Sequence, residues 1–211
     1  MILWGDFMDC FKIDQTKNLV RMFNALPEDA SVDIYVNGEL LYSNVKYKEF
    51  TTYVYGEVGN IKIDVYNTGS KSNPLIRGTV RIPAEQIFTI VLTGNKGEEA
   101  LLVIEDDITQ QPSTESAISR IVNLAPDLPE ADVNFNDAPS ANNISYRDET
   151  LYAYLPPGKY KITVEESETE YDVTEGVFEF KAERIYTIYI IGNPPNVGLI
   201  QSVDGNTYAC L

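Results

Sequence analysis

The chain has 211 residues, of which 44% are hydrophobic and 23% are charged, so it has the composition of a folded protein and the length for two small domains. Its formal net charge of −16 repels phosphate backbones and anionic lipid surfaces, which excludes nucleic-acid binding and membrane association as leading functions. With no His and no glycine-rich phosphate-binding motif, the chain lacks the Ser-His-Asp and Cys-His arrangements, the common nitrogen ligand of zinc and a nucleotide loop, so we expect no enzyme.

The first segment, residues 1–17, is an N-terminal arm without a counterpart later in the chain. Its large apolar side chains are Ile2, Leu3, Trp4, Phe7, Met8 and Phe11. Asp6 and Asp9 interrupt the apolar run that a secretion signal needs, so we expect neither Sec export nor, for want of a long apolar stretch, a membrane anchor. Such an arm needs a surface to bury against, either its own first domain or the open sheet edge of a neighbouring copy.

After the arm, the chain repeats itself. The segment RMFNALPEDASVDIYVNG, which begins at Arg21, aligns without a gap with RIVNLAPDLPEADVNFND, which begins at Arg120, at an offset of 99 residues. Further on, IFTIVLTG from Ile87 aligns with IYTIYIIG from Ile185 at an offset of 98. Self-similarity at a fixed period indicates two tandem copies of one domain.

Each copy has the pattern of short strands. Apolar residues alternate with polar ones over residues 32–36 and 61–65, and turn residues such as Asn37-Gly38 lie between these runs. Short strands at this spacing, in units of about 90 residues, are typical of a two-sheet sandwich. We therefore predict an all-β protein with two tandem immunoglobulin-like β-sandwich domains. Their bounds are 18–107 and 117–211, with a polar linker at 108–116.

The repeated pattern also resembles a known family. Both copies carry R-x-x-N-x-x-P-x-x-x-x-x-D, and the second continues with P-P-G-K-Y-K-I-T-V and A-E-R-I-Y-T-I. These motifs are similar to the bacterial and archaeal domain of unknown function 4397, whose members usually carry H-x-S-P-D-A-P-x-V-D-V-Y-V-N-G. The resemblance covers approximately residues 18–107 and 117–205, and it departs where Asn24 and Asn123 stand in place of His. It implies an immunoglobulin-like sandwich and a place in surface proteins, and it brings no active site.

Residues that the two copies share are expected to form the fold. These pairs include Arg21/Arg120, Asn24/Asn123, Pro27/Pro126 and Asp33/Asp132. The Asp and Asn side chains are suited to fastening loop backbone by hydrogen bonds. A paired ligand site is the alternative.

Carboxylates gather where the first copy ends. Glu105, Asp106 and Asp107 lie there, and Asp127, Glu130 and Asp132 follow the linker. Because calcium prefers several carboxylate and carbonyl oxygens, an interdomain calcium clamp is one hypothesis, and solvated acidic loops are the other. We expect no other cofactor. The paired carboxylates of a glycosidase stay formally possible, although the acidic residues follow a surface alternation.

Tyrosine is abundant, with 14 residues. Exposed aromatic rings stack on sugars, so the tyrosines raise the possibility of a glycan-binding face. Tyr53 with Tyr55, and Tyr152 with Tyr154, have the spacing of neighbours on one face of a strand, where aromatic residues are usually packing partners.

The only two cysteines, Cys10 and Cys210, lie outside the repeats. Sandwiches joined end to end place their termini far apart, and a disulfide needs Cα atoms within about 7 Å. Unless the two domains fold back on each other, the pair is therefore suited to joining successive chains. The alternative is two idle thiols. We accordingly hypothesise a non-catalytic subunit that binds copies of itself head to tail, forming a filament on a cell or spore surface reached by a non-Sec route. The alternative is a monomeric module, on the cell surface or in the cytoplasm, that binds a glycan or protein partner.

Overall fold

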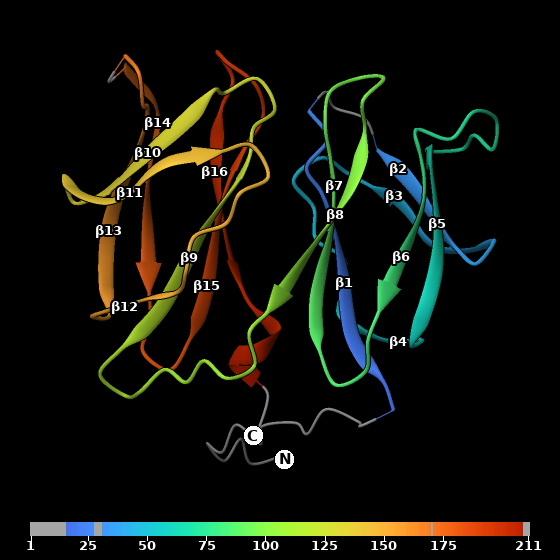
Figure 1. Ribbon diagram of the computed structural model, residues 1–211, viewed down its shortest axis with the longest axis horizontal. Helices are drawn as coiled ribbons and strands as arrows, with labels where there is room; N and C mark the ends of the chain where they lie inside the picture. Colours follow the sequence, from blue (N-terminus) through green and yellow to red (C-terminus); the bar gives the residue numbers. More distant parts are fainter. Residues whose placement is uncertain (1–15, 28–30, 170, 209–211) are drawn as a thin grey trace, which may run out of the picture.

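The computed structural model describes residues 16–27, 31–169 and 171–208. It contains two β-sandwiches of similar construction, domain 1 (residues 18–107) and domain 2 (residues 117–208), which lie side by side (Figure 1). The helical content of the described residues is one short 3-10 helix, and none of these residues belongs to a helix that could cross a membrane.

Within the described residues, domain 1 has eight strands in two sheets. The strands are β1 (Asn18–Asn24), β2 (Val32–Val36), β3 (Glu39–Val45), β4 (Val54–Gly56), β5 (Gly59–Asn67), β6 (Ile76–Ile82), β7 (Ile87–Thr93) and β8 (Ala100–Asp106). One sheet has the order β4-β1-β7-β8 and the other β3-β2-β5-β6. All neighbouring strands are antiparallel except β1 and β7, which are parallel.

Domain 2 repeats this topology. Its strands are β9 (Ala117–Leu124), β10 (Glu130–Phe135), β11 (Ala138–Ser145), β12 (Ala153–Leu155), β13 (Gly158–Glu166), β14 (Tyr171–Phe180), β15 (Ile185–Ile191) and β16 (Gly198–Val203), followed by the 3-10 helix η1 (Gly205–Tyr208). The sheet orders are β12-β9-β15-β16 and β11-β10-β13-β14, with β9 and β15 parallel. The prediction of two tandem all-β sandwiches is confirmed.

The sandwich interiors follow from the alternation in the sequence. Alternate residues of β2 and β5 point into domain 1, where Ile34, Ile63 and Val65 are fully buried. Val133, Ile162 and Val164 take the equivalent positions in domain 2. Each domain therefore has its own hydrophobic core between its two sheets.

Four strands are buried on both faces, because the two domains pack against each other through whole sheets. Every residue of β1, β7, β9 and β15 is buried. A third core between the domains contains Phe23, Val91, Val122, Leu124 and Tyr189, and the ring of Phe23 stacks on that of Phe50 at 3.9 Å. Burial on both faces explains why IFTIVLT and IYTIYII are continuous apolar runs.

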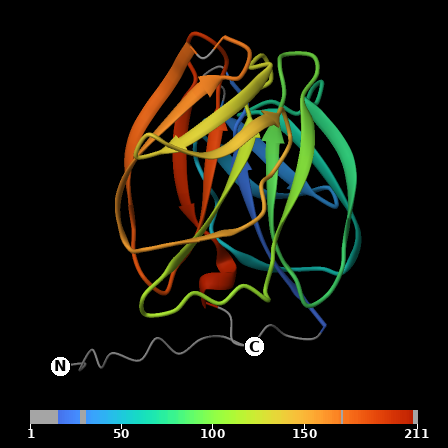
Figure 2. The same ribbon diagram turned by 60° about the vertical axis from the view of Figure 1, so that its left-hand side comes forward.

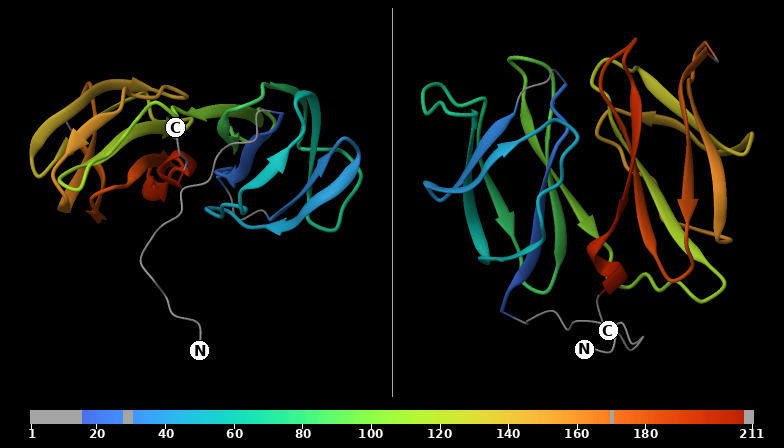
Figure 3. Two further views of the ribbon diagram at one scale, coloured as in Figure 1. Left: turned by 90° about the horizontal axis from the view of Figure 1, so that it is seen from below. Right: turned by 180° about the vertical axis from the view of Figure 1, so that it is seen from behind.

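This packing corrects the expectation that the two ends of the chain lie far apart. The domains fold back on each other, so β1 begins and η1 ends at the same end of the molecule, the lower end in Figures 1 and 2. Seen from below, η1 lies between the two sandwiches (Figure 3). Leu19 and Tyr208 line one shallow hollow there. The large buried interdomain core favours this arrangement over an extended one.

The residues shared by the two copies do fasten loops, as predicted. Asn24 donates from Nδ2 to the carbonyl of Val45 and accepts from the backbone N–H of Leu26, and Asn123 makes the equivalent pair of bonds. Asp33 accepts from the backbone N–H groups of Asn44 and Gly69. Asp132 likewise accepts from the N–H of Asn143. These side chains replace backbone partners that the turns lack.

Candidate functional site

Two places in the molecule combine unusual chemistry with a definite geometry. The first is a buried charge network between the domains, which we call the arginine network. It consists of Arg21, Tyr53, Thr89, Asp106, Arg120, Tyr152, Thr187, Tyr189 and Asp204. Arg21 on β1 and Arg120 on β9 project from the sheet faces that meet, and each donates from Nε to a threonine of the neighbouring strand, at 2.9 Å to Thr89 and 3.0 Å to Thr187.

Each arginine also reaches across to the other domain. Nη1 of Arg21 donates to the carbonyl of Val203 at 3.1 Å, and Nη1 of Arg120 donates to the carbonyl of Glu105 at 2.7 Å. Val203 and Glu105 occupy equivalent positions in the two copies. The contacts are therefore reciprocal, as in a two-fold symmetric dimer whose subunits have been joined into one chain.

Two fully buried carboxylates complete the network. Asp106 of domain 1 pairs with Nη2 of Arg120 at 2.9 Å, whereas Asp204 of domain 2 lies 3.7 Å from Nη2 of Arg21 and accepts from the hydroxyl of Thr187 at 2.7 Å. The hydroxyls of Tyr53 and Tyr152 donate to Asp106 and Asp204 at 3.0 and 3.2 Å. Their rings also lie over the guanidinium groups, at 4.6 Å for Arg21 and 4.7 Å for Arg120.

Burial dominates the electrostatics of these groups. Loss of solvation, reinforced by the neighbouring Asp106, raises the pKa of Asp204 to about 7. Loss of solvation also raises the pKa of Asp106, against the opposing pull of Arg120 and Arg21. The same burial raises the pKa of the Tyr53 hydroxyl, so this hydroxyl remains a hydrogen-bond donor. The two arginines and the two carboxylates, together with the tyrosine rings that lie over them, form a buried cluster that joins the domains.

The arginine network bears directly on the predicted calcium clamp. The structure does not bring the six candidate carboxylates together: Asp106 faces Arg120, Asp107 accepts from Thr109 and Gln110, and Asp127 accepts from Asn95. Glu130 and Asp132 accept from Ser145 and Ser167 within domain 2, and Glu105 offers its backbone carbonyl to Arg120. Within residues 16–27, 31–169 and 171–208, no three acidic or cysteine side chains form a group that could hold a metal ion. The guanidinium of Arg120 supplies the positive charge that the hypothesis assigned to calcium.

The second place is a cavity of about 570 Å³ in domain 1, between its two sheets. Its inner wall is apolar and consists of Val20, Met22, Val36, Ile61, Ile63, Ile82 and Ile90. Its mouth lies between β3 and β4, which are the end strands of their sheets. A volume of this size is typical of ligand pockets.

Domain 2 fills the space that corresponds to this cavity. Val36, Ile61 and Ile82 of domain 1 are matched by Phe135, Tyr160 and Phe180, and the strand registers agree, because Gly59 pairs with Ile82 as Gly158 pairs with Phe180. The three aromatic rings contact one another with centroids 5.6 to 6.0 Å apart. The same fold thus occurs twice in this chain, once with a packed interior and once with an opening.

At the mouth of the cavity, domain 1 has exposed leucine side chains that domain 2 lacks. Leu40 and Leu41 of β3 are 50% and 46% exposed, and Tyr55 of β4 is 52% exposed. The positions of the two leucines in domain 2 hold Pro139 and Ser140. Polar groups at the mouth are Glu39, Asn37 and Glu57, of which the last two are hydrogen-bonded to each other at 3.2 Å.

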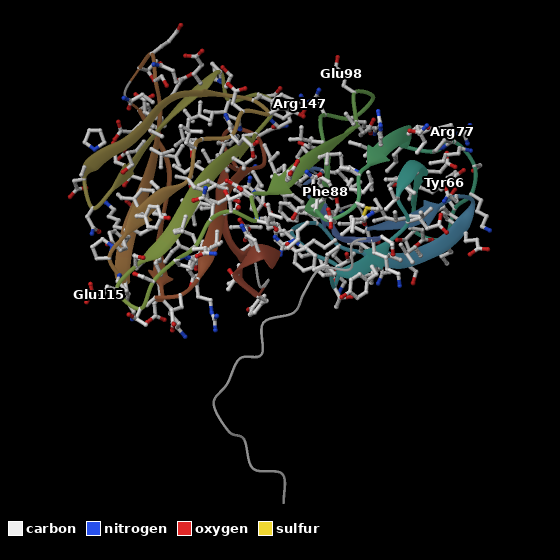
Figure 4. The ribbon with its side chains drawn as sticks, turned by 60° about the horizontal axis from the view of Figure 1, so that its bottom comes forward. Tyr66, Arg77, Phe88, Glu98, Glu115 and Arg147 are labelled. Atoms are coloured by element: carbon white, nitrogen blue, oxygen red, sulfur yellow. The ribbon has the colours of Figure 1, made fainter. Side chains whose placement is uncertain are left out.

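The predicted tyrosine pairs separate into two roles. Tyr53 and Tyr152 point into the arginine network, whereas Tyr55 and Tyr154 point outward and are 52% and 62% exposed. Near the lower end, a hollow of about 330 Å³ is lined by Leu19, Tyr53, Tyr55, Gly205 and Tyr208. On the outer side of domain 1, Tyr66 lies beside Arg77, which donates to its hydroxyl at 3.4 Å (Figure 4).

The remaining predicted site residues lie outside the described part of the chain. These are Cys10 and Cys210 and the arm residues Ile2, Leu3, Trp4, Phe7, Met8 and Phe11. The described chain reaches the arm at Lys17, whose ammonium lies 5.4 Å from the centre of the Tyr55 ring, at the mouth of the cavity.

A comparison of the sequence with family profiles gives two matches to a single family, the domain of unknown function DUF4397, over residues 18–126 and 117–209. Together these matches cover nearly the whole described chain. The chain belongs to the DUF4397 family. The first match covers domain 1 and continues through the linker and β9 of domain 2, and the second covers domain 2. The family resemblance noted in the sequence is confirmed. Among curated proteins, no sequence matches this chain.

Solved structures that align with this chain include three with low sequence identity. The CBM26-family module CBMbc from Eubacterium rectale Amy13K, in complex with maltoheptaose, is 9% identical with a TM-score of 0.32, and the alignment covers 90% of this chain and 99% of that one. An alpha-glucan-binding streptococcal virulence factor is 13% identical with a TM-score of 0.28, over 92% and 100% of the two chains. A leucine-rich repeat protein from Bacteroides thetaiotaomicron is 12% identical with a TM-score of 0.24, over 85% and 26%. At these TM-scores the likenesses carry no argument about function.

Sequence reasoning missed both the cavity and the arginine network. The signal for the cavity was present as the differences between the copies at Val36/Phe135, Ile61/Tyr160 and Ile82/Phe180. At each of these matched positions domain 1 has the smaller apolar side chain, and this difference in size marks the place of the cavity.

Proposed function

We propose that this DUF4397 protein is a non-catalytic binding module whose first domain takes up an extended, apolar segment of a protein partner. The observation that carries the proposal is the cavity of domain 1, open in one copy and filled by three aromatic rings in the other. Phe135, Tyr160 and Phe180 demonstrate that this fold accommodates a packed interior, so the opening in domain 1 is not a requirement of the fold.

The form of the mouth supports an extended protein segment. β3 and β4 are end strands, and an end strand offers unpaired backbone N–H and C=O groups to a further strand. Exposed Leu40 and Leu41 on β3 add apolar contact area beside that edge. A partner strand therefore gains backbone hydrogen bonds from β3 and places alternate side chains over the cavity.

Head-to-tail assembly into a filament has less support than binding. It rested on chain ends that lie far apart, whereas Leu19 and Tyr208 line the same hollow. Self-association through the arm and the cysteines depends on residues outside the described part of the chain.

The experiment that tests the proposal compares the native chain with a filled variant, in which Val36→Phe, Ile61→Tyr and Ile82→Phe copy the side chains of domain 2. Peptides are selected on the immobilised native protein from a random display library, and their affinities for both proteins are measured by titration. We expect peptides rich in Leu, Phe and Trp that bind the filled variant at least about tenfold more weakly, a loss of about 1.4 kcal/mol. Equal affinities for the two folded proteins would overturn the proposal.

A second candidate function is glycan binding at the tyrosine-lined hollow. Tyr55 and Tyr208 are 52% and 42% exposed there, and their ring faces form an apolar, shallow surface of the kind on which sugars stack. Glycan-array binding that is lost in Tyr55→Ala and Tyr208→Ala, but kept in a Tyr171→Ala control on domain 2, would support this candidate. An array without signal for the native protein would remove it.

A further inference from the structure

The cavity of domain 1 and the N-terminal arm are the two apolar features that the second copy does not share. The matched space in domain 2 is filled, and domain 2 follows the polar linker 108–116 and not an apolar arm. The arm concentrates six large apolar side chains, Ile2, Leu3, Trp4, Phe7, Met8 and Phe11. An unfilled apolar opening and an unmatched apolar segment thus belong to the same half of the chain.

The position at which the arm joins the fold brings the two features together. Asn18, the first residue of β1, pairs with Gly56 of β4, and its Nδ2 donates to the carbonyl of Glu57 at 3.0 Å. Gly56 and Glu57 both line the cavity mouth, and Lys17 lies over the ring of Tyr55 at the same mouth. The arm therefore leaves domain 1 at the opening itself.

We infer that residues 2–11 of the arm occupy the cavity of their own domain 1 and act as a resident competitor that a partner segment must displace. This inference rests on the proposed function of the cavity and assigns a regulator to it. Fifteen residues span up to about 50 Å when extended, which is ample for a segment that starts at the mouth. A short tether also keeps the arm at an effective concentration of the order of millimolar, which favours the same chain over a second copy.

The chemistry of both partners agrees with this assignment. The lining of the cavity is mostly apolar, with Val, Ile, Leu and Met side chains and the rings of Tyr42 and Tyr55 beside the polar Asn37, Glu39 and Glu57. The segment Ile2-Leu3-Trp4 is uncharged. Burial of apolar surface stabilises the docked state by about 25 cal/mol per Å². Three aromatic side chains fill the equivalent space in domain 2, so a few apolar residues of the arm suffice for domain 1.

The first experiment uses Trp4, which is the only tryptophan in the chain and therefore reports on the arm alone. In the native protein we expect blue-shifted Trp4 emission with low access to acrylamide, independent of protein concentration. In the filled variant we expect red-shifted emission and free quenching, while a Val177→Tyr control on the exposed face of β14 keeps the native spectrum. Exposed Trp4 in the native protein, or buried Trp4 in a folded filled variant, overturns the inference. Burial that appears only with oligomers also overturns it, in favour of a second copy.

A second experiment covers the case in which the filled variant does not fold. The chain without residues 1–15 keeps every described strand, and the neutral apolar dye Nile red and a reduced synthetic peptide of residues 1–15 serve as probes. We expect the shortened chain to bind Nile red at least about tenfold more tightly than the native chain, and the peptide to displace the dye. If the dye binds but the peptide does not compete, the arm is not the occupant and the proposed function still stands. If neither probe binds, the proposed function fails together with the inference.

Discussion

At the scale of single residues, the most informative group is Asp204. It is fully buried, accepts hydrogen bonds from Thr187 and Tyr152, and lies 3.7 Å from both Arg21 and Arg120. Removal of one member of such a network leaves the others buried without a partner, which is far more costly than replacing the whole network by apolar groups. The reciprocal contacts of Arg21 and Arg120 therefore specify how the two domains pair.

Asp204 gives the interface a defined pH dependence. Because its pKa is raised to about 7 in the folded protein, the native state binds more protons than the unfolded state between about pH 4 and pH 7. The contribution of Asp204 to stability is therefore greatest at low pH and falls as the pH rises through this range. Since Asp204→Asn does not titrate, we expect the melting temperature of the variant to rise relative to the native protein between about pH 5 and pH 8.

The control for this prediction is Asp137→Asn, on the exposed turn between β10 and β11 and outside the arginine network. Thermal denaturation followed by circular dichroism at both pH values measures it. A melting difference between native protein and Asp204→Asn that is constant with pH would mean that Asp204 stays ionised throughout.

At the scale of elements, η1 ties the end of domain 2 to domain 1. The N–H of Gly205 donates to Asp106 at 2.9 Å, and Nδ2 of Asn206 donates to the carbonyl of Asp107 at 2.8 Å. No side chain fits at Gly205, where a Cβ atom would lie 2.7 Å from Cγ2 of Ile87 and 3.0 Å from the Tyr53 ring. This close approach brings the helix against β7 and beneath the arginine network.

Gly205→Ala should accordingly destabilise the protein by about 1–3 kcal/mol, the usual result of forcing extra volume into a packed site. Gly198→Ala on β16 is the matched control, because its nearest neighbour would be 3.8 Å away, at the Lys48 ammonium. We expect that control to stay within about 0.5 kcal/mol of the native protein. Urea denaturation measures both, and equal stabilities would show that η1 shifts freely.

At the scale of the whole molecule, the side-by-side packing of the domains changes which disulfide we expect from the two cysteines. Cys10 lies seven residues before Lys17, and Cys210 lies two residues after Tyr208. Tyr55, which contacts Lys17, lines the same hollow as Tyr208. A seven-residue stretch spans up to about 25 Å, so the two thiols are within reach of each other in one chain.

We therefore expect oxidation of the dilute protein by oxidised glutathione to give an intrachain Cys10–Cys210 bridge. On non-reducing electrophoresis the product should run as one band, faster than the reduced chain, because the closed loop is more compact when denatured. Cys10→Ser should abolish the shift. A ladder of multimers would instead support the head-to-tail assembly predicted from the sequence.

The sequence by itself determined the fold of each domain. The alternation over residues 32–36 and 61–65, and the repeat at an offset of 99, depend on local periodicity, which a reader of the sequence sees directly. The loop-fastening roles of Asn24 and Asp33 were also predictable, because short polar side chains bond nearby backbone.

The tertiary structure alone decided how the domains pair and where the candidate site lies. Arg21 and Asp204 are 183 residues apart in the sequence, and Arg120 contacts Asp106 across the domain interface. No local sequence pattern therefore predicts either contact. The continuous apolar runs of β7 and β15 indicated burial on both faces but not which surface covers the second face. The cavity likewise depends on how side chains from β1, β2, β5, β6 and β7 fill a shared volume. Packing is a property of side chains brought together from distant parts of the chain, and only the folded molecule fixes it.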